Sequence, residues 1–426
     1  MSKAKSDTSD SSVNYGQLSH YFTGVAARRL SVVDIDGKRS NQHEFNGTKA
    51  LRRIFGDDDQ KNQNATFVYL CDDDTETLIE QGMLSWYDAR KNHPTRTEYR
   101  LYYSDGEVIE NAMPKDTLFV ALIKDENPVV IITKADSMRE SQLMWLFGID
   151  YISDNDFALS DMKNVELSPY MLNLFEELGI NLGIEPKTPV WAEPLIEKLL
   201  EKYPDGLPSC KEFSDFVIST MPDIEERIAN PDRLLVDLYN QGTVLFKGYE
   251  KRHYDNVFKT IIDTYGVDSD KIMAASDSAA QARKSRAGKA LENYAAYIME
   301  QMGIRFSPQA TTEKSEKPDF LFPSKEDYHN PKFSAKNLNL LAAKTTAKDR
   351  WRQVLNEGNR VSRKHLLTLD TGFSSDMLDN IKAHNLQIVL PTPYWGAYSK
   401  KDQKHFMSFA QFCELVLAIQ NKIDAN

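Results

Sequence analysis

The sequence contains few cysteines and no long apolar run. Its three cysteines, Cys71, Cys210 and Cys413, lie far apart and form no Cys-x-x-Cys motif. Neither a disulfide framework nor a cysteine zinc site is therefore expected. No apolar stretch approaches the roughly 18 residues that a membrane span requires, and the N-terminus does not have the pattern of a secretory leader. We therefore expect a soluble, cytoplasmic protein that does not bind a membrane.

Histidine pairs and a phosphate-binding loop are missing as well. The eight histidines are scattered, with no pair at i, i+4 spacing, so neither a histidine metal site nor a Ser-His-Asp site is indicated. Gly288 and Lys289 faintly resemble a phosphate-binding loop, but Arg283 and Ala290 occupy positions where that motif needs glycine and a hydroxyl residue. Nucleoside triphosphate hydrolysis is therefore not expected.

Positive charge is in deficit over the whole chain. There are 52 Lys and Arg against 63 Asp and Glu, which gives a formal net charge of −11. An acidic total argues against nucleic-acid binding, because phosphate contacts need a positive surface. The local distribution differs, since residues 344–364 contain seven Lys or Arg against two acids, and four more Lys or Arg fall within residues 283–289. Basic faces are therefore expected within an acidic protein.

The length of the chain predicts more than one domain. A single hydrophobic core does not extend over 426 residues. Residues 1–14 are rich in Ser, Asp and Lys and are expected to form a disordered tail. Loop signals dominate residues 151–189, which form the expected connection between an N-terminal domain of residues 15–150 and a C-terminal domain of residues 190–426.

Short runs of β-branched and aromatic residues fill the N-terminal domain. Turn-forming residues separate them, and this pattern predicts a small barrel or sandwich. The expected strands are 30–33, 66–70, 99–103, 117–123 and 129–133. Helices are expected at 48–55 and 137–147. The C-terminal domain is expected to be helical from Trp191 to about Gly303 and then to combine strands and helices.

A Lys-Pro-Asp sequence and a strand-ending lysine mark the C-terminal domain. Asp319 opens the apolar run 320–322, and Lys344 closes the apolar run 338–343. Both therefore read as strand residues that one sheet brings side by side. The commonest sequence form of a metal-dependent nuclease site is Pro-Asp, a spacer, and then acid-x-Lys. Here Ala342 occupies the position of the second acid.

Glu357 is the candidate replacement for the missing acid. It stands thirteen positions after Lys344, on a helix that Asp349 is expected to cap. A helix of that length spans about 13 Å, so its far end can return to the sheet. Carboxylates at Asp319 and Glu357 would hold a hard cation such as Mg²⁺, and the Lys344 amine would neutralise charge on the phosphate. The pattern therefore predicts a metal-dependent nuclease site.

Three segments carry a family resemblance. Residues 283–292, 317–324 and 341–357 resemble, in the same order, the catalytic domain of the EcoRII group of type II restriction endonucleases, within the PD-(D/E)XK superfamily. The resemblance implies an α/β domain with a central mixed sheet flanked by helices, which cleaves double-stranded DNA with Mg²⁺. It implies catalytic roles for Asp319, Lys344, Glu357, Glu292 and Tyr328. It implies metal ligation by Asp319, Glu357 and the Ala343 carbonyl. From the residues alone, Glu292 is also interpretable as an exposed charge on a helix.

The resemblance also implies which residues of the catalytic domain read DNA. The family carries its C:G-reading residues directly after the catalytic strand, where this chain has Lys348, Asp349 and Arg350. Arg or Lys donates to guanine and a carboxylate accepts from cytosine, and each good contact gives about 1–3 kcal/mol of discrimination. Asp349 also has an interpretation as a helix N-cap only. Arg233 stands near the family's arginine that contacts the central or flipped base pair.

A second basic and aromatic segment lies in the N-terminal domain. Residues 86–100 interleave basic, amide and aromatic side chains, which suits groove contacts with DNA, although a solvated strand edge explains the composition as well. The segment resembles one DNA-recognition arm of the EcoRII effector domain, a mainly-β pseudobarrel like the plant "B-three" fold. The implied DNA-binding residues of this arm are Arg90, Thr95, Arg96, Glu98 and Arg100. Those of the other arm are Ser40, Asn41, Gln42 and His43.

Together these features predict a type II restriction endonuclease with an N-terminal effector domain. It would cut both strands of a short site flanked by CC and GG and leave 5′-phosphates, and a symmetric homodimer would serve the two strands. The resemblance implies a second, effector copy of DNA that relieves autoinhibition, and a cognate DNA methyltransferase. Two alternatives are open: a nuclease of the same fold for modified or damaged DNA, and a non-catalytic DNA-binding regulator. The intact set Asp319, Lys344 and Glu357 disfavours the regulator.

Overall fold

The computed structural model describes most of the chain. The described residues are 17–35, 43–71, 77–154, 156–178, 189–204, 206–313, 316–345, 347 and 350–425. The chain forms two compact units, one built mainly from residues 186–302 and the other mainly from residues 16–167 and 303–426. The predicted tail, 1–14, and part of the predicted connection, 179–188, lie outside the described residues. In the described part, no helix has the length and apolar character needed to cross a membrane.

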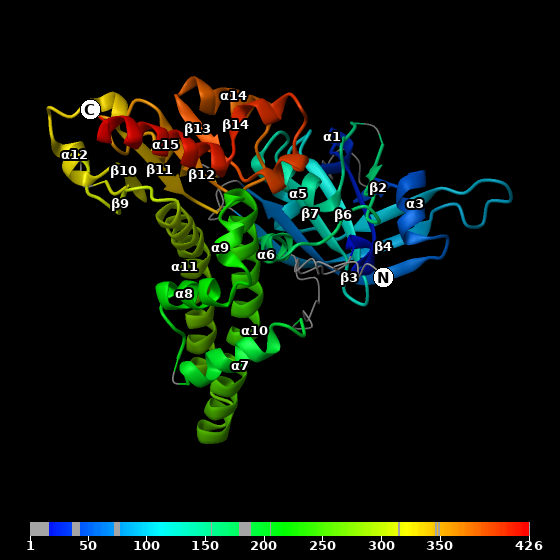
Figure 1. The fold of residues 1–426 in the computed structure, drawn as a ribbon. Helices are drawn as coiled ribbons and strands as arrows, with labels where there is room; N and C mark the ends of the chain where they lie inside the picture. The colour runs from blue at the N-terminus through cyan, green and yellow to red at the C-terminus, as the bar shows by residue number, and fades with distance from the viewer. Residues whose placement is uncertain are drawn as a thin grey trace, which may run out of the picture. The chain divides into compact units, whose positions relative to one another are not determined.

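The larger unit begins with a curled eight-stranded sheet (Figure 1). Its strand order is β2-β5-β4-β3-β7-β6-β1-β8, and all neighbours are antiparallel except β3 and β7. The strands are β1 (Phe22–Arg29), β2 (Glu44–Asn46), β3 (Gln60–Leu70), β4 (Leu78–Asp88), β5 (Tyr99–Tyr103), β6 (Thr117–Ile123), β7 (Val129–Thr133) and β8 (Ala158–Leu159). A mainly-β N-terminal region is therefore confirmed, including the strands expected at 66–70, 99–103, 117–123 and 129–133.

The strand expected at 30–33 is wrong. A short helix, α1 (Val32–Ile35), lies there, directly after β1. The Asp34 carboxylate accepts hydrogen bonds from the backbone N–H (2.7 Å) and the hydroxyl (2.6 Å) of Ser31, and it pairs with the buried Arg28 guanidinium. These local bonds satisfy the backbone in a helical turn, and they override the β propensity of the valines.

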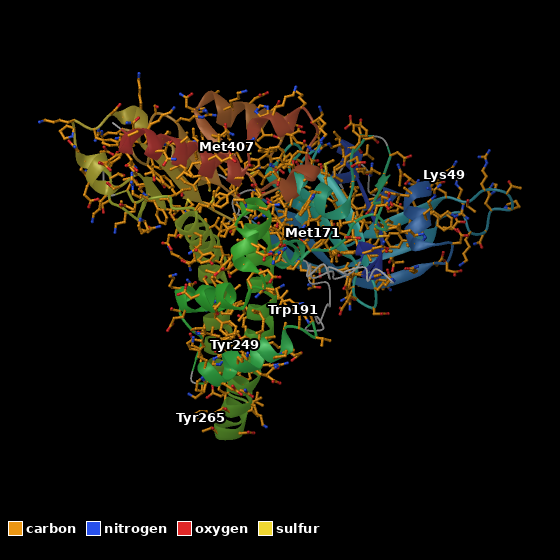
Figure 2. All side chains as sticks on the ribbon, in the orientation of Figure 1. Lys49, Met171, Trp191, Tyr249, Tyr265 and Met407 are labelled. Carbon is orange, nitrogen blue, oxygen red and sulfur yellow. The ribbon has the colours of Figure 1, made fainter. Side chains whose placement is uncertain are left out.

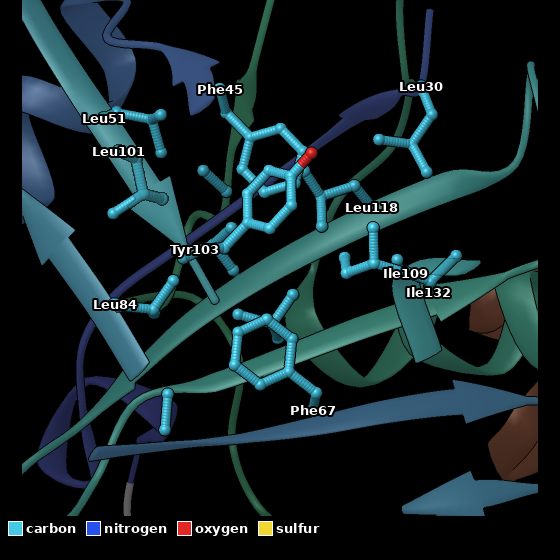
Figure 3. Packing of buried hydrophobic residues seen from close by; sticks show 14 of the residues in the cluster. Leu30, Phe45, Leu51, Phe67, Leu84, Leu101, Tyr103, Ile109, Leu118 and Ile132 are labelled. Atoms are coloured by element: carbon cyan, nitrogen blue, oxygen red, sulfur yellow. The ribbon is translucent and has the colours of Figure 1, made fainter. Parts of the chain in front are cut away.

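Helices accompany this sheet, and aromatic rings pack in its hydrophobic core. The helices are α3 (Lys49–Phe55), α4 (Glu107–Asn111), α5 (Met138–Phe147) and α6 (Pro169–Glu177). Thr48 and Ser137 cap α3 and α5, so the helices expected at 48–55 and 137–147 are confirmed. Figure 3 shows Phe45 and Tyr103 packed together, with their ring centroids 4.6 Å apart. Trp86 is fully buried and stacks on rings from α3 and β5.

The smaller unit is helical. It contains α7 (Glu193–Lys202), α8 (Cys210–Thr220), α9 (Ile224–Arg227), α10 (Pro231–Tyr265) and α11 (Ser269–Gln301). Figure 2 labels Tyr249 within this unit; its ring is buried and its hydroxyl donates to the Gly206 carbonyl at 2.8 Å. The helical character expected between 191 and 303 is confirmed.

The larger unit also contains a mixed six-stranded sheet, of order β14-β13-β12-β11-β10-β9. Its strands are β9 (Ser307–Pro308), β10 (Phe320–Phe322), β11 (Asn339–Ala343), β12 (Lys364–Leu367), β13 (Leu386–Val389) and β14 (Phe406–Met407). β9, β10 and β11 pair antiparallel, and β11 to β14 pair parallel. Its helices are α12 (Lys325–His329), α13 (Arg350–Val354), α14 (Ser375–Ala383) and α15 (Phe409–Asp424). The expected mixed α/β character is therefore confirmed.

A buried carboxylate fixes the segment that follows β11. Asp370, just beyond β12, is fully buried and accepts hydrogen bonds from the Ala347 N–H (2.8 Å), the Gly372 N–H (2.9 Å) and the Gln142 side-chain amide (3.0 Å). Nearby, the Thr368 hydroxyl donates to the Thr345 carbonyl at 3.2 Å. Hydrogen bonds to charged acceptors are stronger than those to neutral ones, so the bond from the Ala347 N–H to Asp370 fixes the chain just after Lys344.

Removing that carboxylate should destabilise the protein strongly. In Asp370→Ala, three buried donors lose their acceptor, which we expect to lower the free energy of unfolding by about 3 kcal/mol or more. Urea-induced unfolding of the full chain measures this. The control, Glu414→Ala, removes an exposed acid of α15 and should change the free energy by less than about 0.5 kcal/mol. Equal effects of the two substitutions would contradict the role given to Asp370.

Candidate active site

The register of three strands aligns the residues of the site. Phe320 pairs with Leu341 on one side and with Pro308 on the other. One residue further along, Asp319 therefore stands opposite Ala342 of β11, and the Gln309 N–H donates to its carbonyl at 3.2 Å. Directly opposed residues of antiparallel strands project from the same face of the sheet. Asp319 thus lies beside the position at which this chain has alanine in place of an acid.

The Asp319 carboxylate is buried and held by three donors. One oxygen, Oδ2, accepts from the Ala343 N–H (2.8 Å) and from Lys344 Nζ (2.8 Å). The other, Oδ1, accepts from the Gln309 side-chain amide at 2.7 Å. Asp319 is 5% exposed, whereas the Lys344 side chain is 27% exposed, so the lysine is partly accessible to solvent. The structure therefore brings the predicted pair Asp319 and Lys344 into direct contact.

Glu357 supplies a second carboxylate close to this pair. Burial, and next the charge of Asp319, raise the pKa of Glu357 to about 7, and the charge of Lys344 opposes the rise. One of its carboxylate oxygens, Oε2, is buried without a hydrogen-bond partner. A buried carboxylate oxygen without a hydrogen-bond partner is costly, and such groups concentrate at functional sites.

The position of Glu357 corrects the sequence prediction in one respect. The expectation that a helix carries Glu357 is wrong, because α13 ends at Val354. Glu357 follows in a turn in which its N–H donates to the Val354 carbonyl at 3.2 Å, and Gly358 takes a left-handed conformation with φ +57°. Glycine adopts that conformation without steric cost, so the helix stops before Glu357 and the turn directs the chain toward β12.

A buried lysine supports this turn. Lys364, at the start of β12, is 8% exposed, and its Nζ donates to the Leu355 carbonyl at the end of α13. Burial lowers the pKa of Lys364, and the charges of Glu357 and Glu313 oppose that effect. The amine thus satisfies the Leu355 carbonyl and offsets part of the negative charge of Glu357 and Glu313.

Tyr328 lies beneath the same turn. It is buried in α12, and its hydroxyl donates to the Glu313 carboxylate at 2.5 Å, which also accepts from the Asn359 N–H at 3.2 Å. Burial, and next the hydrogen bond to Glu313, raise the pKa of Tyr328 to about 12. Arg360 donates to the Tyr328 and Phe333 carbonyls. Tyr328 therefore links α12 to the segment after Glu357, and a catalytic role for it stays a prediction.

Two predicted residues lie in the helical unit. Glu292, on α11, accepts a hydrogen bond from Lys289 Nζ at 2.9 Å. Arg233, in the first turn of α10, donates to Asp237 at 3.1 Å, and its side chain is 47% exposed. Their participation in the site at Asp319 stays a prediction.

The oxygen ligands present fit a hard cation. Among the residues that the structure describes, no group of three or more His, Cys, Asp or Glu is arranged to hold a metal ion. A Mg²⁺ ion would therefore rely on Asp319, Glu357, a backbone carbonyl such as that of Ala343, and water, which is the ligand type that this ion takes. The buried Glu357 oxygen without a partner is consistent with such a ligand.

The predicted N-terminal arm forms a polar network beside a cleft. Glu98 forms ion pairs with both Arg90 and Arg100, and these hold the pKa of its carboxyl below the usual value. The Asp88 side chain accepts from the N–H groups of Arg90 (2.9 Å) and Glu98 (2.7 Å). A cleft of about 550 Å³ opens next to this arm, with Lys61, Arg90, Lys91 and His93 among its lining residues. Thr95 and Arg96 are exposed at the tip of the arm.

Most of the remaining predicted DNA-binding residues lie outside the described residues or next to them. Ser40, Asn41, Gln42, Lys348 and Asp349 lie outside the described residues. Arg350 begins α13. His43 is described: it pairs with Asp105 at 3.0 Å and packs edge-on against Tyr103.

Sequence reasoning missed Gln309 and Glu313. Both lie between β9 and β10, before Asp319, in a stretch for which the sequence pattern predicted no role. The contact of Gln309 with Asp319 depends on strand register, and that of Glu313 with Tyr328 on how the loop packs against α12; no local pattern in that stretch indicates either. The feature that identifies Gln309 as part of the site is its position opposite Asp319 in the sheet.

Comparisons with known proteins agree with the C-terminal pattern. Residues 246–413 match the family model described as EcoRII C terminal. The type II restriction enzyme EcoRII of Escherichia coli is 36% identical over 184 residues, which cover 43% of this chain and 45% of that protein. The type II restriction enzyme SsoII of Shigella sonnei is 28% identical over 152 residues, covering 33% and 48%. The resemblance of the C-terminal part to EcoRII-type enzymes is confirmed, and the chain spans about half the length of these relatives.

Two solved structures are also similar. Metal-depleted Ecl18kI in complex with uncleaved, modified DNA has a TM-score of 0.45 and 18% identity, covering 54% of this chain and 85% of that one. The restriction endonuclease PspGI in complex with substrate DNA has a TM-score of 0.39 and 18% identity, covering 57% and 98%.

The unpartnered Glu357 predicts an unusual dependence of stability on pH. Because the folded-state pKa of Glu357 lies near 7 and the ordinary value is 4.5, the folded chain holds this proton more tightly than the unfolded chain. Stability is therefore lost as pH rises from about 4.5 to about 7, by at most about 3 kcal/mol. Glu357→Gln should unfold at higher urea than the parent at pH 8 in chelator, and the difference should vanish near pH 4.5.

An exposed acid provides the control for this measurement. Glu414→Gln should follow the parent at every pH, because Glu414 is exposed on α15. A parent and a Glu357→Gln variant with parallel stability curves from pH 4.5 to 8 would show that Glu357 ionises normally.

Proposed function

We propose that this chain, whose C-terminal part resembles EcoRII-type restriction enzymes, is a type II restriction endonuclease with a PD-(D/E)XK catalytic domain. The observation that carries the proposal is the convergence of Asp319, Lys344 and the unpartnered Glu357 at one end of β10 and β11. The substrate would be double-stranded DNA with a short site flanked by CC and GG. Cleavage would need Mg²⁺ and leave 5′-phosphates.

Each residue of the site has a distinct part in the proposed hydrolysis. When bound, Mg²⁺ would supply positive charge to the scissile phosphate and acidity to a bound water. Asp319 and Glu357 would hold it, with the Ala343 carbonyl as a further ligand. The Lys344 amine, which keeps donors beyond the one used by Asp319, would donate hydrogen bonds to the attacking water and to a phosphate oxygen, so that the water is held in line with the leaving group.

Recognition of the site is proposed for the segment between Lys344 and Glu357. Lys348 and Arg350 are suited to donate to guanine, and Asp349 to accept from cytosine. Arg233 is proposed to contact the central base pair. The buried Asp370 supports this assignment, because it holds the Ala347 N–H and thereby fixes one point of the segment.

The N-terminal sheet is proposed to be an effector domain that binds a second copy of DNA. Arg90 and Arg100 flank Glu98 beside an open cleft, and such a group offers cationic contacts to phosphates and a carboxylate acceptor to a base edge. Relief of autoinhibition by this second copy, a homodimer of catalytic domains, a cytoplasmic location and a cognate DNA methyltransferase belong to the same proposal.

Cleavage of phage DNA tests the proposed function directly. The purified full chain, incubated with unmethylated phage DNA and Mg²⁺, should produce discrete ends that share a CC- and GG-containing motif. Lys344→Ala should cut at least about 10³-fold more slowly, because it removes the amine that neutralises charge at the phosphate. Sequencing of the fragment ends measures the outcome. Random ends, or equal cutting by the variant, would reject the proposal, and cutting only of methylated DNA would favour the modified-DNA alternative.

The salt dependence of binding tests the arm of the N-terminal domain. In a Lys344→Ala background, Arg96→Ala should weaken binding of effector DNA about equally for all sequences and reduce the slope of log affinity against log salt by about one. Lys134→Ala, an exposed lysine after β7, is the matched control and should leave the slope unchanged. Fluorescence anisotropy with labelled duplex over a salt series measures both. An unchanged slope for Arg96→Ala would remove this residue from the interface.

A further inference from the structure

Gln309 lies beside Asp319 and contacts its carboxylate. It directly follows β9, and its N–H donates to the Asp319 carbonyl at 3.2 Å, so the two residues face each other across the β9–β10 pair. Side chains of opposed residues leave the same face of the sheet with their Cβ atoms about 5 Å apart. The longer side chain of Gln309 therefore reaches the Asp319 carboxylate without any rearrangement of the backbone.

The contact between them is a short, directed hydrogen bond. Gln309 Nε2 donates to Asp319 Oδ1 at 2.7 Å. An ionised carboxylate only accepts, so the amide must present its NH₂ group. The other oxygen, Oδ2, is taken by the Ala343 N–H and Lys344. A carboxylate oxygen has two acceptor sites, so Oδ1 keeps one for a further partner.

The backbone of Gln309 is in a conformation that this residue type rarely adopts. Its φ is +49°, in the left-handed region. Of the other six non-glycine residues with positive φ in the described chain, five are Asn or Asp, such as Asn385. Asn and Asp tolerate this region because their short side chains form local hydrogen bonds, whereas the amide of Gln309 donates to the Asp319 carboxylate. The unfavourable backbone conformation of Gln309 thus lies next to the carboxylate of the proposed site.

We infer that Gln309 is a positioning residue for the cation site, an inference that rests on the proposed function. Its amide fixes the rotation of the Asp319 carboxylate, so that Oδ2 remains the partner of Lys344 and Oδ1 remains the oxygen offered to Mg²⁺. Hydrogen-bond partners of this kind orient metal-binding carboxylates, and their loss typically costs 10–100-fold in metal affinity or activity. Glycine would relieve the backbone, but it would release the carboxylate.

Two substitutions separate the amide from the backbone. Gln309→Gly removes both the amide and the left-handed strain, and Gln309→Met keeps the side-chain length and the strain but removes the donor. The matched control is Asn385→Gly, which relieves a left-handed residue (φ +57°) at the exposed turn between α14 and β13. All four full-length proteins should have thermal unfolding midpoints in chelator within a few degrees of one another, because the Asp319 pair with Lys344 persists in each.

Calorimetric titration of Mg²⁺ into the DNA-free full chain gives the deciding readout. We expect the dissociation constant to rise about 10–100-fold in both Gln309 variants and to stay unchanged in Asn385→Gly. Cleavage at saturating Mg²⁺ should recover most of the parent rate, since the amide acts on the carboxylate and not on the phosphate.

Three results would overturn this inference. Parent-like Mg²⁺ affinity in the two Gln309 variants would reject it and leave the proposed function intact. A cleavage defect that saturating Mg²⁺ does not reduce would assign Gln309 to the substrate and not to the cation site. The proposed function, and this inference with it, would be rejected if the parent chain did not cut DNA and if the Asp319→Ala substitution left Mg²⁺ binding unchanged.

Discussion

The ion pair between Lys344 and Asp319 is the contact around which the C-terminal sheet is organised. A buried carboxylate is costly unless donors replace its water, and Asp319 obtains its donors from the strands on either side. The antiparallel pairing of β9, β10 and β11 therefore forms the sheet and also brings the hydrogen-bond donors to the buried Asp319 carboxylate. The β10 side carries the carboxylate, the β9 side supplies one donor and the β11 side supplies two, so the geometry of the site depends on the strand register.

Glu357 differs, because one of its carboxylate oxygens is buried without a hydrogen-bond partner. It stands in a turn and not on a strand, and Lys364, Tyr328 and Glu313 support the backbone around it and not its own oxygen. Natural proteins retain such groups at the expense of stability where activity needs them. The two acids of the site are thus held by different means, one by strand pairing and one by the packing of a turn.

The sequence allowed part of this arrangement to be predicted, because that part is local. Asp319 and Lys344 adjoin apolar runs whose strands are readable, and most strands of the N-terminal sheet follow from the same kind of pattern. The helix assigned to Glu357 extended too far, since a single left-handed glycine after the turn outweighs the helical composition before it. Gln309 and Asp370 could not be predicted, because their partners lie across strands or in distant segments, and hydrogen bonds of this kind leave no periodic trace in the chain.

The alanine at position 342 has a consequence for how the site could be switched. With the second acid absent from β11, the lysine and one acid belong to the sheet, whereas the other acid belongs to the segment that also carries the residues proposed to read the bases. A displacement of that segment would separate the two carboxylates while β10 and β11 stayed intact. Correct base contacts that settle the segment would bring the carboxylates together. Cleavage would then be specific because the two carboxylates come together only after the segment has bound the correct bases.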